Sequence, residues 1–289
     1  IAQEQVAERT GQAETLFACL IARPRPAPPA AKPEPTFDQA RLDTIEGWLF
    51  PEAIDLTARL VRWQHGMGVA GGVLELGVYM GKYLGLLASL SQGTGMPVVG
   101  VDAYTNRVGE QHAQADRDFA RDTAVANIVG MAPAGPPPTL LVAFTADVDA
   151  PTLRALSPGG YSFISVDAAH VMEDVGRDLL LVEALMGEHT IVAADDAFSA
   201  PLPGVSEALF RHFIGQPDRL MAPVAWAGNK LFLCHRARHP ATLAHLHRLI
   251  DDADAPGYLQ KTRVVRQHNR DVAFTPMLFG YEMIGFSWT

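Results

Sequence analysis

The sequence predicts an α/β protein with a mostly parallel sheet that helices cover on both faces. Short apolar segments alternate with helical patterns from residue 53 onward, and most of these segments are apolar along nearly their whole length. Strands buried on both faces of a parallel sheet have such continuous apolar runs, whereas half-exposed strands alternate. The predicted strands span residues 72–76, 97–102, 139–144, 161–166 and 190–194, with helices such as 83–90 and 172–186 between them.

Two later segments predict a hairpin at the edge of this sheet. Residues 220–226 and 230–234 are strand-like, and the short link Ala227-Gly228-Asn229 separates them. A link of this length joins antiparallel strands, since a parallel crossover needs roughly a dozen residues or more. We therefore expect a doubly wound, Rossmann-like sheet of seven strands, mostly parallel, that ends in an antiparallel C-terminal hairpin.

Composition divides the chain into three parts. Residues 1–22 are rich in Ala, Glu and Gln and predict an N-terminal helix, and residues 23–36 are Pro-rich and predict a semi-rigid linker. Residues 37–289 suffice for one large domain with a C-terminal extension. The N-terminal part is interpreted as a tethered packing or homo-oligomerisation helix, with an SH3-type ligand as the alternative. The aromatic-rich residues 272–286 pack on the domain, form a dimer contact or line a binding pocket.

Charge and cysteine content exclude several classes of protein. The net charge of −9 gives no basic footprint for nucleic acid. Cys19 and Cys234 form neither a disulfide framework nor a zinc-ligand spacing, which fits a cytoplasmic location. No apolar run approaches the ~20 residues that span a bilayer, and we see no signal-peptide pattern, so we expect no membrane partner.

A glycine-bearing turn follows the first predicted strand. Glu75, Gly77 and Gly81 have the spacing E-x-G-x-x-x-G, where a dinucleotide fold has G-x-G-x-x-G. Glycine lets the backbone approach a ligand closely, and ligands of such sheets bind beyond the carboxyl ends of the strands. The turn therefore indicates a cofactor site, although a structural α/β loop supplies a similar pattern.

The next two strands end in acidic residues that suit an adenosine cofactor. Asp102 closes the second strand, where ribose hydroxyls lie in folds of this kind; the alternative is that its carboxylate caps a turn or helix. Ala146 and Asp147 follow the third strand, where the adenine edge falls, and the Asp147 carboxylate is a candidate acceptor for the adenine amino group.

Carboxylates also gather at the ends of the fourth and fifth strands. Asp167 follows one strand, and Asp195 and Asp196 follow its neighbour. Three carboxylates in one cleft repel one another unless a cation neutralises them, and an oxygen-rich cluster suits Mg²⁺. The alternative is that Asp195 caps the next helix and Asp167 is solvated. We therefore expect a divalent-cation site made of these three residues.

His170 lies just beyond Asp167, before the helix predicted at residues 172–186. Imidazole titrates near neutral pH, so it is a suitable general base for a hydroxyl that a metal has acidified. A lone histidine is often structural, but the neighbouring acids favour a catalytic role for His170. The other histidines, including those at positions 235, 239, 245 and 247, are interpreted as mostly solvated.

Together these motifs resemble the macrocin O-methyltransferase-like group, also called methyltransferase family 24, over roughly residues 40 to 236. The resemblance lies in the sequences Ile45-Glu46-Gly47-Trp48-Leu49, Val73-Leu74-Glu75-Leu76-Gly77 with Gly81, Phe163-Ile164-Ser165-Val166-Asp167 with His170, Asp174 and Arg177-Asp178, and Asp195-Asp196. Ala168-Ala169 and Tyr83 depart from the family pattern, and these departures leave the substrate class open.

The resemblance implies a class I O-methyltransferase of natural-product pathways that depends on S-adenosylmethionine (AdoMet) and Mg²⁺ or another divalent cation. Its partner is a small-molecule hydroxyl acceptor, a sugar first and a catechol-like phenol second. The resemblance implies that His170 takes the proton, that the cation binds Asp167, Asp195 and Asp196, and that Glu75, Gly77 and Asp102 hold AdoMet. We also expect Asp167 to be catalytic, and Tyr79, Gly81, Ala146, Asp147 and Asp167 to contact AdoMet.

Two other functions compete with this one. An NAD-dependent oxidoreductase is compatible with the α/β pattern, but the missing G-x-G-x-x-G disfavours it. An inactive protein of the same fold that serves as a binding scaffold has little reason to retain three mutually repelling carboxylates.

The polar residues 105–122 follow the second strand and predict a lid over the site that orders when a ligand binds; a surface helix is the alternative.

Overall fold

A computed structural model describes residues 35–105, 114–252 and 254–286. The predicted N-terminal helix, and the predicted linker up to residue 34, lie outside the described residues. The end of the linker contacts the domain, because Arg62 donates to the Pro35 carbonyl at 2.8 Å and Ser89 donates to the Thr36 carbonyl at 3.2 Å.

The centre of the domain is an eight-stranded sheet in the order β10-β6-β7-β5-β4-β1-β2-β3. Strands β1 to β5 run parallel, and β7 pairs antiparallel with both β5 and β6, so the predicted parallel sheet with a C-terminal hairpin is confirmed. The strands are β1 (Gly72–Leu76), β2 (Val98–Asp102), β3 (Thr139–Val142), β4 (Tyr161–Val166), β5 (Met186–Ala194), β6 (Met221–Ala227), β7 (Lys230–His235) and β10 (Ile284–Gly285).

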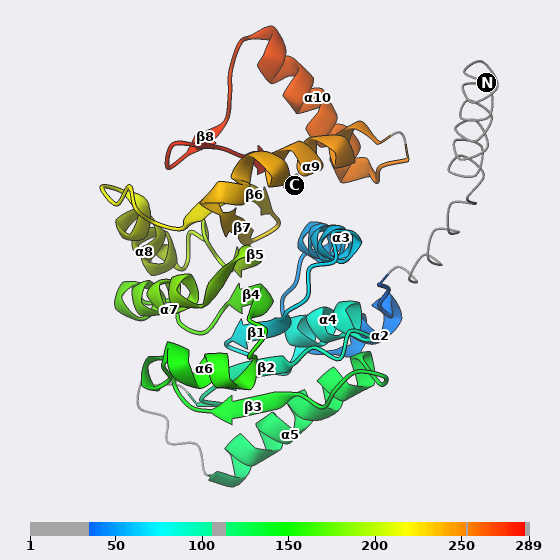
Figure 1. The fold of residues 1–289 in the computed structure, drawn as a ribbon, viewed down its shortest axis with the longest axis vertical. Helices are drawn as coiled ribbons and strands as arrows, with labels where there is room; N and C mark the ends of the chain where they lie inside the picture. Colours follow the sequence, from blue (N-terminus) through cyan, green and yellow to red (C-terminus); the bar gives the residue numbers. More distant parts are fainter. Residues whose placement is uncertain (1–34, 106–113, 253, 287–289) are drawn as a thin grey trace, which may run out of the picture. The chain divides into compact units, whose positions relative to one another are not determined.

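Helices cover both faces of this sheet (Figure 1). One layer contains α2 (Gln39–Thr44), α3 (Pro51–Gly66), α4 (Lys82–Ser91), α5 (Gln114–Met131) and α9 (His239–Asp251), and the other contains α6 (Ala150–Leu156), α7 (Met172–Leu185) and α8 (Pro203–Phe213). Short 3₁₀ turns, η1 (Thr145–Asp147) and η2 (Arg236–Arg238), link strands to helices.

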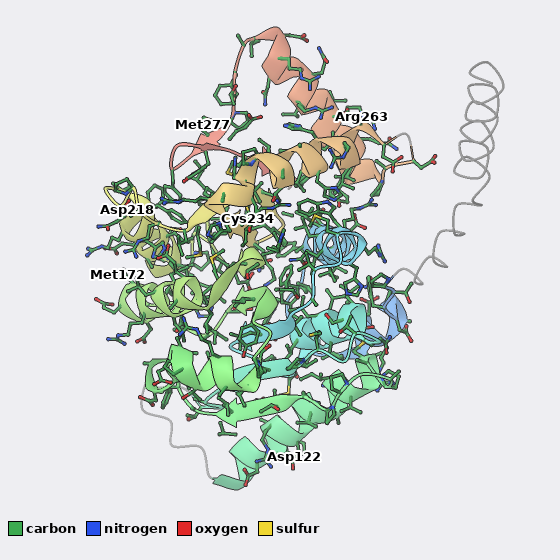
Figure 2. All side chains as sticks on the ribbon, in the orientation of Figure 1. Asp122, Met172, Asp218, Cys234, Arg263 and Met277 are labelled. Atoms are coloured by element: carbon green, nitrogen blue, oxygen red, sulfur yellow. The ribbon has the colours of Figure 1, made fainter. Side chains whose placement is uncertain are left out.

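Alternation along each strand divides the core into two hydrophobic layers. Val73 and Phe163, which are register partners on β1 and β4, face the α3–α4 side, and the next residues, Leu74 and Ile164, face the α7 side. Side chains fill the space on both sides of the sheet, with Cys234 in the interior (Figure 2). Burial raises the pKa of the Cys234 thiol to about 12, so this cysteine stays protonated at neutral pH.

The C-terminal extension packs on the domain. After α10 (Gly257–Asp271) the chain forms the β8 (Met277–Leu278) and β9 (Tyr281–Glu282) pair, and β10 then adds an eighth strand parallel to β6. Phe286 is fully buried in the α3–α4 core, and its backbone N–H donates to the Trp226 carbonyl at 2.6 Å. Packing, one of the three predicted roles for residues 272–286, is therefore observed.

Three of the histidines predicted to be mostly solvated are not, among them His212 of α8, which is 4% exposed. His239 is buried and bonds the Glu282 carbonyl at 2.8 Å, while the half-buried His245 stacks on Trp63 at 4.5 Å between ring centroids. The prediction was wrong for His239 and His245 because the amphipathic face of α9 packs against β6 and the C-terminal strands, and it was wrong for His212 because that residue lies on the buried face of α8. None of the helices in the described part of the chain combines the length and apolar composition needed to cross a bilayer.

Candidate active site

Backbone hydrogen bonds fix the carboxyl ends of four parallel strands at one level. The Gly77 N–H donates to Val101 at 2.8 Å, the Asp167 N–H to Leu76 at 2.7 Å, and the Asp195 N–H to Val166 at 3.0 Å. Each residue directly follows its strand, so the sheet register continues one position past β1, β4 and β5. The acids of different strands therefore meet at one edge of the sheet, as the sequence predicts.

Gly77 is where two strands approach too closely for a side chain. Its φ is +86°, and a Cβ at this position would lie 2.1 Å from the Asp167 carbonyl oxygen. This close approach draws the β1–α4 turn against the end of β4, which brings the turn to the acidic side chains.

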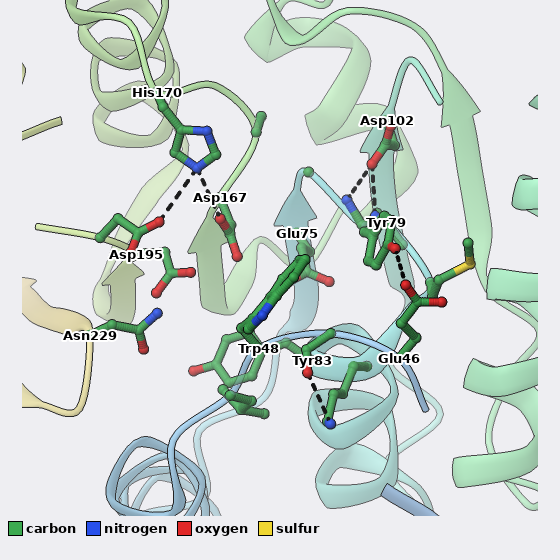
Figure 3. A pocket seen from close by; sticks show the side chains of 18 of the residues that line it. Glu46, Trp48, Glu75, Tyr79, Tyr83, Asp102, Asp167, His170, Asp195 and Asn229 are labelled. Carbon is green, nitrogen blue, oxygen red and sulfur yellow. Dashed lines mark hydrogen bonds and ion pairs between the residues drawn. The ribbon is translucent and has the colours of Figure 1, made fainter. Parts of the chain in front are cut away.

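The Asp102 carboxylate holds this turn in shape. Its Oδ2 accepts the N–H groups of Val78 and Tyr79, each at 2.8 Å, and its Oδ1 accepts the Tyr104 N–H at 2.6 Å (Figure 3). These contacts correspond to the turn-capping alternative. Asp102 also lines the site cavity, so the turn-capping contacts leave it accessible to a ligand. Its contact with a ribose stays a prediction.

Backbone strain is concentrated at the site. Tyr79, Tyr104 and Asp196 have φ values of +48°, +49° and +52°, and they make up three of the five non-glycine residues with positive φ in the described ranges. Residues held in this sparsely populated region cluster at functional sites because the surrounding contacts must over-determine them.

Glu75 acts on the neighbouring helix from a buried position. Its Oε2 accepts the Leu84 N–H at 2.9 Å, which satisfies a free donor in the first turn of α4. Burial, and next the charge of Asp167, raise the pKa of Glu75 well above its usual range.

Asp167, His170 and Asp196 form a compact cluster whose ligand atoms all lie within 4.8 Å of one another. The His170 Nε2 atom lies 3.8 Å from Asp167 Oδ1 and 3.5 Å from Asp196 Oδ2 (Figure 3). Hydrogen bonding to Asp167 raises the pKa of His170, and burial raises the pKa of both Asp167 and Asp196. Two carboxylates beside one imidazole are an arrangement that suits a cation.

Asp195 is directed to a different partner. It is 7% exposed, and its Oδ1 lies 3.0 Å from the Nζ atom of Lys230, which is 1% exposed. The ammonium also lies 3.8 Å from Asp167 Oδ2 and 4.4 Å from the centre of the Tyr83 ring. Burial alone would lower the pKa of Lys230, but Asp195 and Asp167 raise it above its usual value, so the lysine stays charged.

These groups line one cavity of about 940 Å³. Eight predicted site residues line it, namely Glu75, Gly77, Tyr79, Asp102, Asp167, His170, Asp195 and Asp196. Gly81, Ala146 and Asp147 are not among its described lining residues: Gly81 caps α4, and Ala146 and Asp147 are exposed in η1. Their contacts with a cofactor stay predictions.

The predicted lid is partly described. Residues 106–113 lie outside the described residues, and residues 114–122 form the first turns of α5, as the surface-helix alternative holds. Phe119 and Ala120 of this helix line the cavity, so the segment borders the site. Its ordering on ligand binding stays a prediction.

Two residues at the site, Lys230 and Trp48, have no role that their sequence context indicates. Lys230 begins an apolar strand directly after the hairpin link, and there a lysine resembles an ordinary exposed strand end. Its burial follows from the antiparallel β5–β7 register, in which Ala194 faces Leu231. Trp48 lines the cavity from the segment before α3.

We expect Lys230→Met to destabilise the fold by about 3 kcal/mol, because it leaves the buried Asp195 carboxylate without its cation. Urea unfolding followed by circular dichroism measures this loss. The double variant Lys230→Met/Asp195→Asn should recover part of it, and Lys261→Met, at an exposed position of α10, should stay within about 0.5 kcal/mol of the wild type. Equal stability of Lys230→Met and the wild type would contradict the charge pairing.

Comparison with known proteins finds a family match in the central region of the chain. Residues 74–197 match the family model described as a methyltransferase domain, methyltransferase family 24, which confirms the resemblance. The matched region runs from β1 to the residue after Asp196 and so contains both the glycine turn and the acidic cluster. A comparison with curated proteins finds no match.

Several solved structures of O-methyltransferases are similar to part of this chain. The calicheamicin methyltransferase CalS11 is 18% identical, with 64% of this chain and 80% of that chain covered and a TM-score of 0.46. The O-methyltransferase NovP is 15% identical, with 63% and 80% covered and a TM-score of 0.47. An O-methyltransferase from Bacillus cereus in complex with SAH is 11% identical, with 78% and 97% covered and a TM-score of 0.46.

The family match and the observed strand order agree. Strands β2 to β5, most of β1 and the acids at the carboxyl ends of β1, β2, β4 and β5 lie within the matched residues, whereas the antiparallel β7 follows them in the chain. Residues 74–197 of this chain are therefore similar to the methyltransferase domain of family 24, and they lie in an α/β domain with a mostly parallel sheet.

Proposed function

We propose that this protein transfers a methyl group from AdoMet to a hydroxyl of a small molecule, and that a divalent cation assists the transfer. The observation that carries the proposal is a base, His170, held beside two carboxylates in the same cavity as the glycine turn of β1. We further propose a vicinal diol as the acceptor group, as in a sugar or glycosylated natural product, with a catechol second.

The glycine-turn half of the cavity fits the cofactor. Gly77 and Tyr79 present backbone in the positive-φ region, and Asp102 lies behind them with its carboxylate on the same turn. The cavity of about 940 Å³ is at the upper end of the ~300–1,000 Å³ usual for a small-molecule site. It therefore has room for a cofactor and an acceptor together.

The acidic half fits a cation. Asp167 and Asp196 offer carboxylate oxygens beside the His170 ring, and burial makes their negative charge costly without a partner. Asp195 completes the proposed ligand set, although Lys230 already balances part of its charge. When bound, AdoMet supplies an electrophilic methyl group and the cation lowers the pKa of the hydroxyl it contacts.

The chain's own residues supply positioning and proton transfer. His170 Nε2 accepts the hydroxyl proton, and Asp167 and Asp196 stabilise the imidazolium that results, because both carboxylates face that nitrogen. The strand register fixes these groups relative to the glycine turn, which supports the proposal that acceptor and cofactor share this cavity.

We expect His170→Ala to lower kcat by about 10²–10⁴-fold, since it removes the proton acceptor, and to leave the Kd for S-adenosylhomocysteine (SAH) unchanged. Turnover assays and calorimetry measure the two quantities. His268→Ala, at an exposed position of α10, is the matched control. Unchanged kcat, or loss of SAH binding, would show that His170 has another role.

We expect Asp196→Asn to weaken divalent-cation binding by at least about tenfold, because one charged ligand is lost. Titration with Mn²⁺ followed by electron paramagnetic resonance reads binding without activity, and the Mg²⁺ concentration for half-maximal turnover should rise in parallel. Asp218→Asn, in the exposed loop before β6, is the control. Equal Mn²⁺ affinity of Asp196→Asn and wild type would remove Asp196 from the cation site.

A further inference from the structure

An exposed indole stands at the mouth of the cavity. Trp48 is 82% exposed, yet it lines the cavity from the segment between α2 and α3. Figure 3 shows its ring in front of the site, between the Asp195 and Asn229 side and Tyr79. Its ring stacks on Tyr79 with 6.2 Å between centroids and 23° between planes, which is an offset aromatic pair.

The segment that carries Trp48 is held at both ends. On one side, Tyr79 Oη donates to Glu46 Oε1 at 2.6 Å and Lys82 Nζ donates to the Gly47 carbonyl at 3.1 Å. On the other side Phe50 packs on the β6–β7 hairpin, where a Cβ at Gly228 would lie 2.5 Å from the Phe50 Cβ. The backbone at Trp48 is thus fixed between the glycine turn and the hairpin.

Fold stability does not account for this arrangement. A mostly exposed indole buries little apolar surface and so contributes little to the stability of the fold. Its stacking partner Tyr79 has a strained φ of +48°, which hydrogen bonds to Asp102 and Glu46 hold in place. A large apolar surface presented at a cavity rim is typical of a binding site. The two rings form a ledge that we call the Trp48–Tyr79 ledge.

The position of the ledge indicates which ligand it binds, the cofactor or the acceptor. Tyr79 belongs to the glycine-turn half of the cavity, where its N–H donates a hydrogen bond to Asp102. Trp48 extends toward the β6–β7 hairpin and Asp195, which is the acidic half (Figure 3). A molecule lying on the indole therefore sits where the two halves meet. That is the place an acceptor must occupy, since its hydroxyl has to reach both His170 and the methyl group.

We propose that the Trp48–Tyr79 ledge binds the acceptor through the apolar face of a six-membered ring that carries vicinal hydroxyls. The proposal rests on the proposed function and names its acceptor subsite. An aromatic face binds both the C–H face of a pyranose and a planar phenol ring, and the rigid backbone adds no ordering cost. The ledge thus sets the orientation of the acceptor ring, and the acidic half of the cavity determines which of its hydroxyls is methylated.

The test compares Trp48→Ala and Trp48→Phe with the wild type, using a methyl pyranoside and catechol as separate acceptors. Trp48→Ala should raise the acceptor KM about tenfold, the scale of one lost stacking contact, with kcat within about twofold. Trp48→Phe should restore most of the affinity because it keeps an aromatic face. Trp63→Phe, whose ring stacks on His245 and does not line the cavity, is the matched control.

SAH calorimetry on the same variants separates this proposal from the proposed function. Unchanged SAH affinity in Trp48→Ala together with a raised acceptor KM supports the ledge. A loss of SAH affinity as large as the rise in KM would assign Trp48 to the cofactor, and an unchanged KM would overturn the ledge. If wild type itself fails to bind SAH, the proposed function fails first.

Binding is also read without turnover. The emission difference between wild type and Trp48→Phe isolates the indole at position 48, and in SAH-loaded protein it should change on titration with the methyl pyranoside or with catechol. A response to one of the two identifies the ring class. No response to either acceptor in protein that binds SAH would overturn the proposal.

Discussion

The register of the strand ends is the constraint on which the site depends. Gly77, Asp167 and Asp195 each donate a backbone hydrogen bond to the neighbouring strand, and these bonds place a turn and three acids from separate parts of the chain at one level. The register in turn requires a glycine at position 77, because a Cβ there would lie 2.1 Å from the Asp167 carbonyl oxygen. Side-chain chemistry at this edge is thus a consequence of backbone geometry.

Gathering carboxylates at one edge has an electrostatic cost, and the chain offsets it in two ways. Lys230, fully buried, balances Asp195 and part of the charge of Asp167, which stabilises the apoprotein. Asp167 and Asp196 keep uncompensated charge beside His170, and burial raises the pKa of both carboxyls. The Lys230 ammonium therefore stabilises the fold, and the carboxylates of Asp167 and Asp196 are available to bind a metal cation.

Most of the fold and the acidic cluster could be predicted from the sequence, because buried strands, their order and the acids at their ends are local patterns. The role of Lys230 could not, since its burial depends on the antiparallel pairing of β7 with β5. The prediction for His239 and His245 was wrong for a similar reason, because the residues beside them in the sequence do not indicate that α9 packs on the sheet. The ledge of Trp48 on Tyr79 likewise joins residues that are 31 positions apart, through a turn of positive φ.

We propose that the glycine turn holds AdoMet rather than a dinucleotide, and the most direct test is calorimetry with SAH. The purified protein should bind SAH with micromolar affinity with or without Mg²⁺, and it should not bind NAD under the same conditions. Binding of NAD, or no binding of SAH at millimolar concentration, would contradict the account, because the turn at Gly77 and Tyr79 would then serve another ligand.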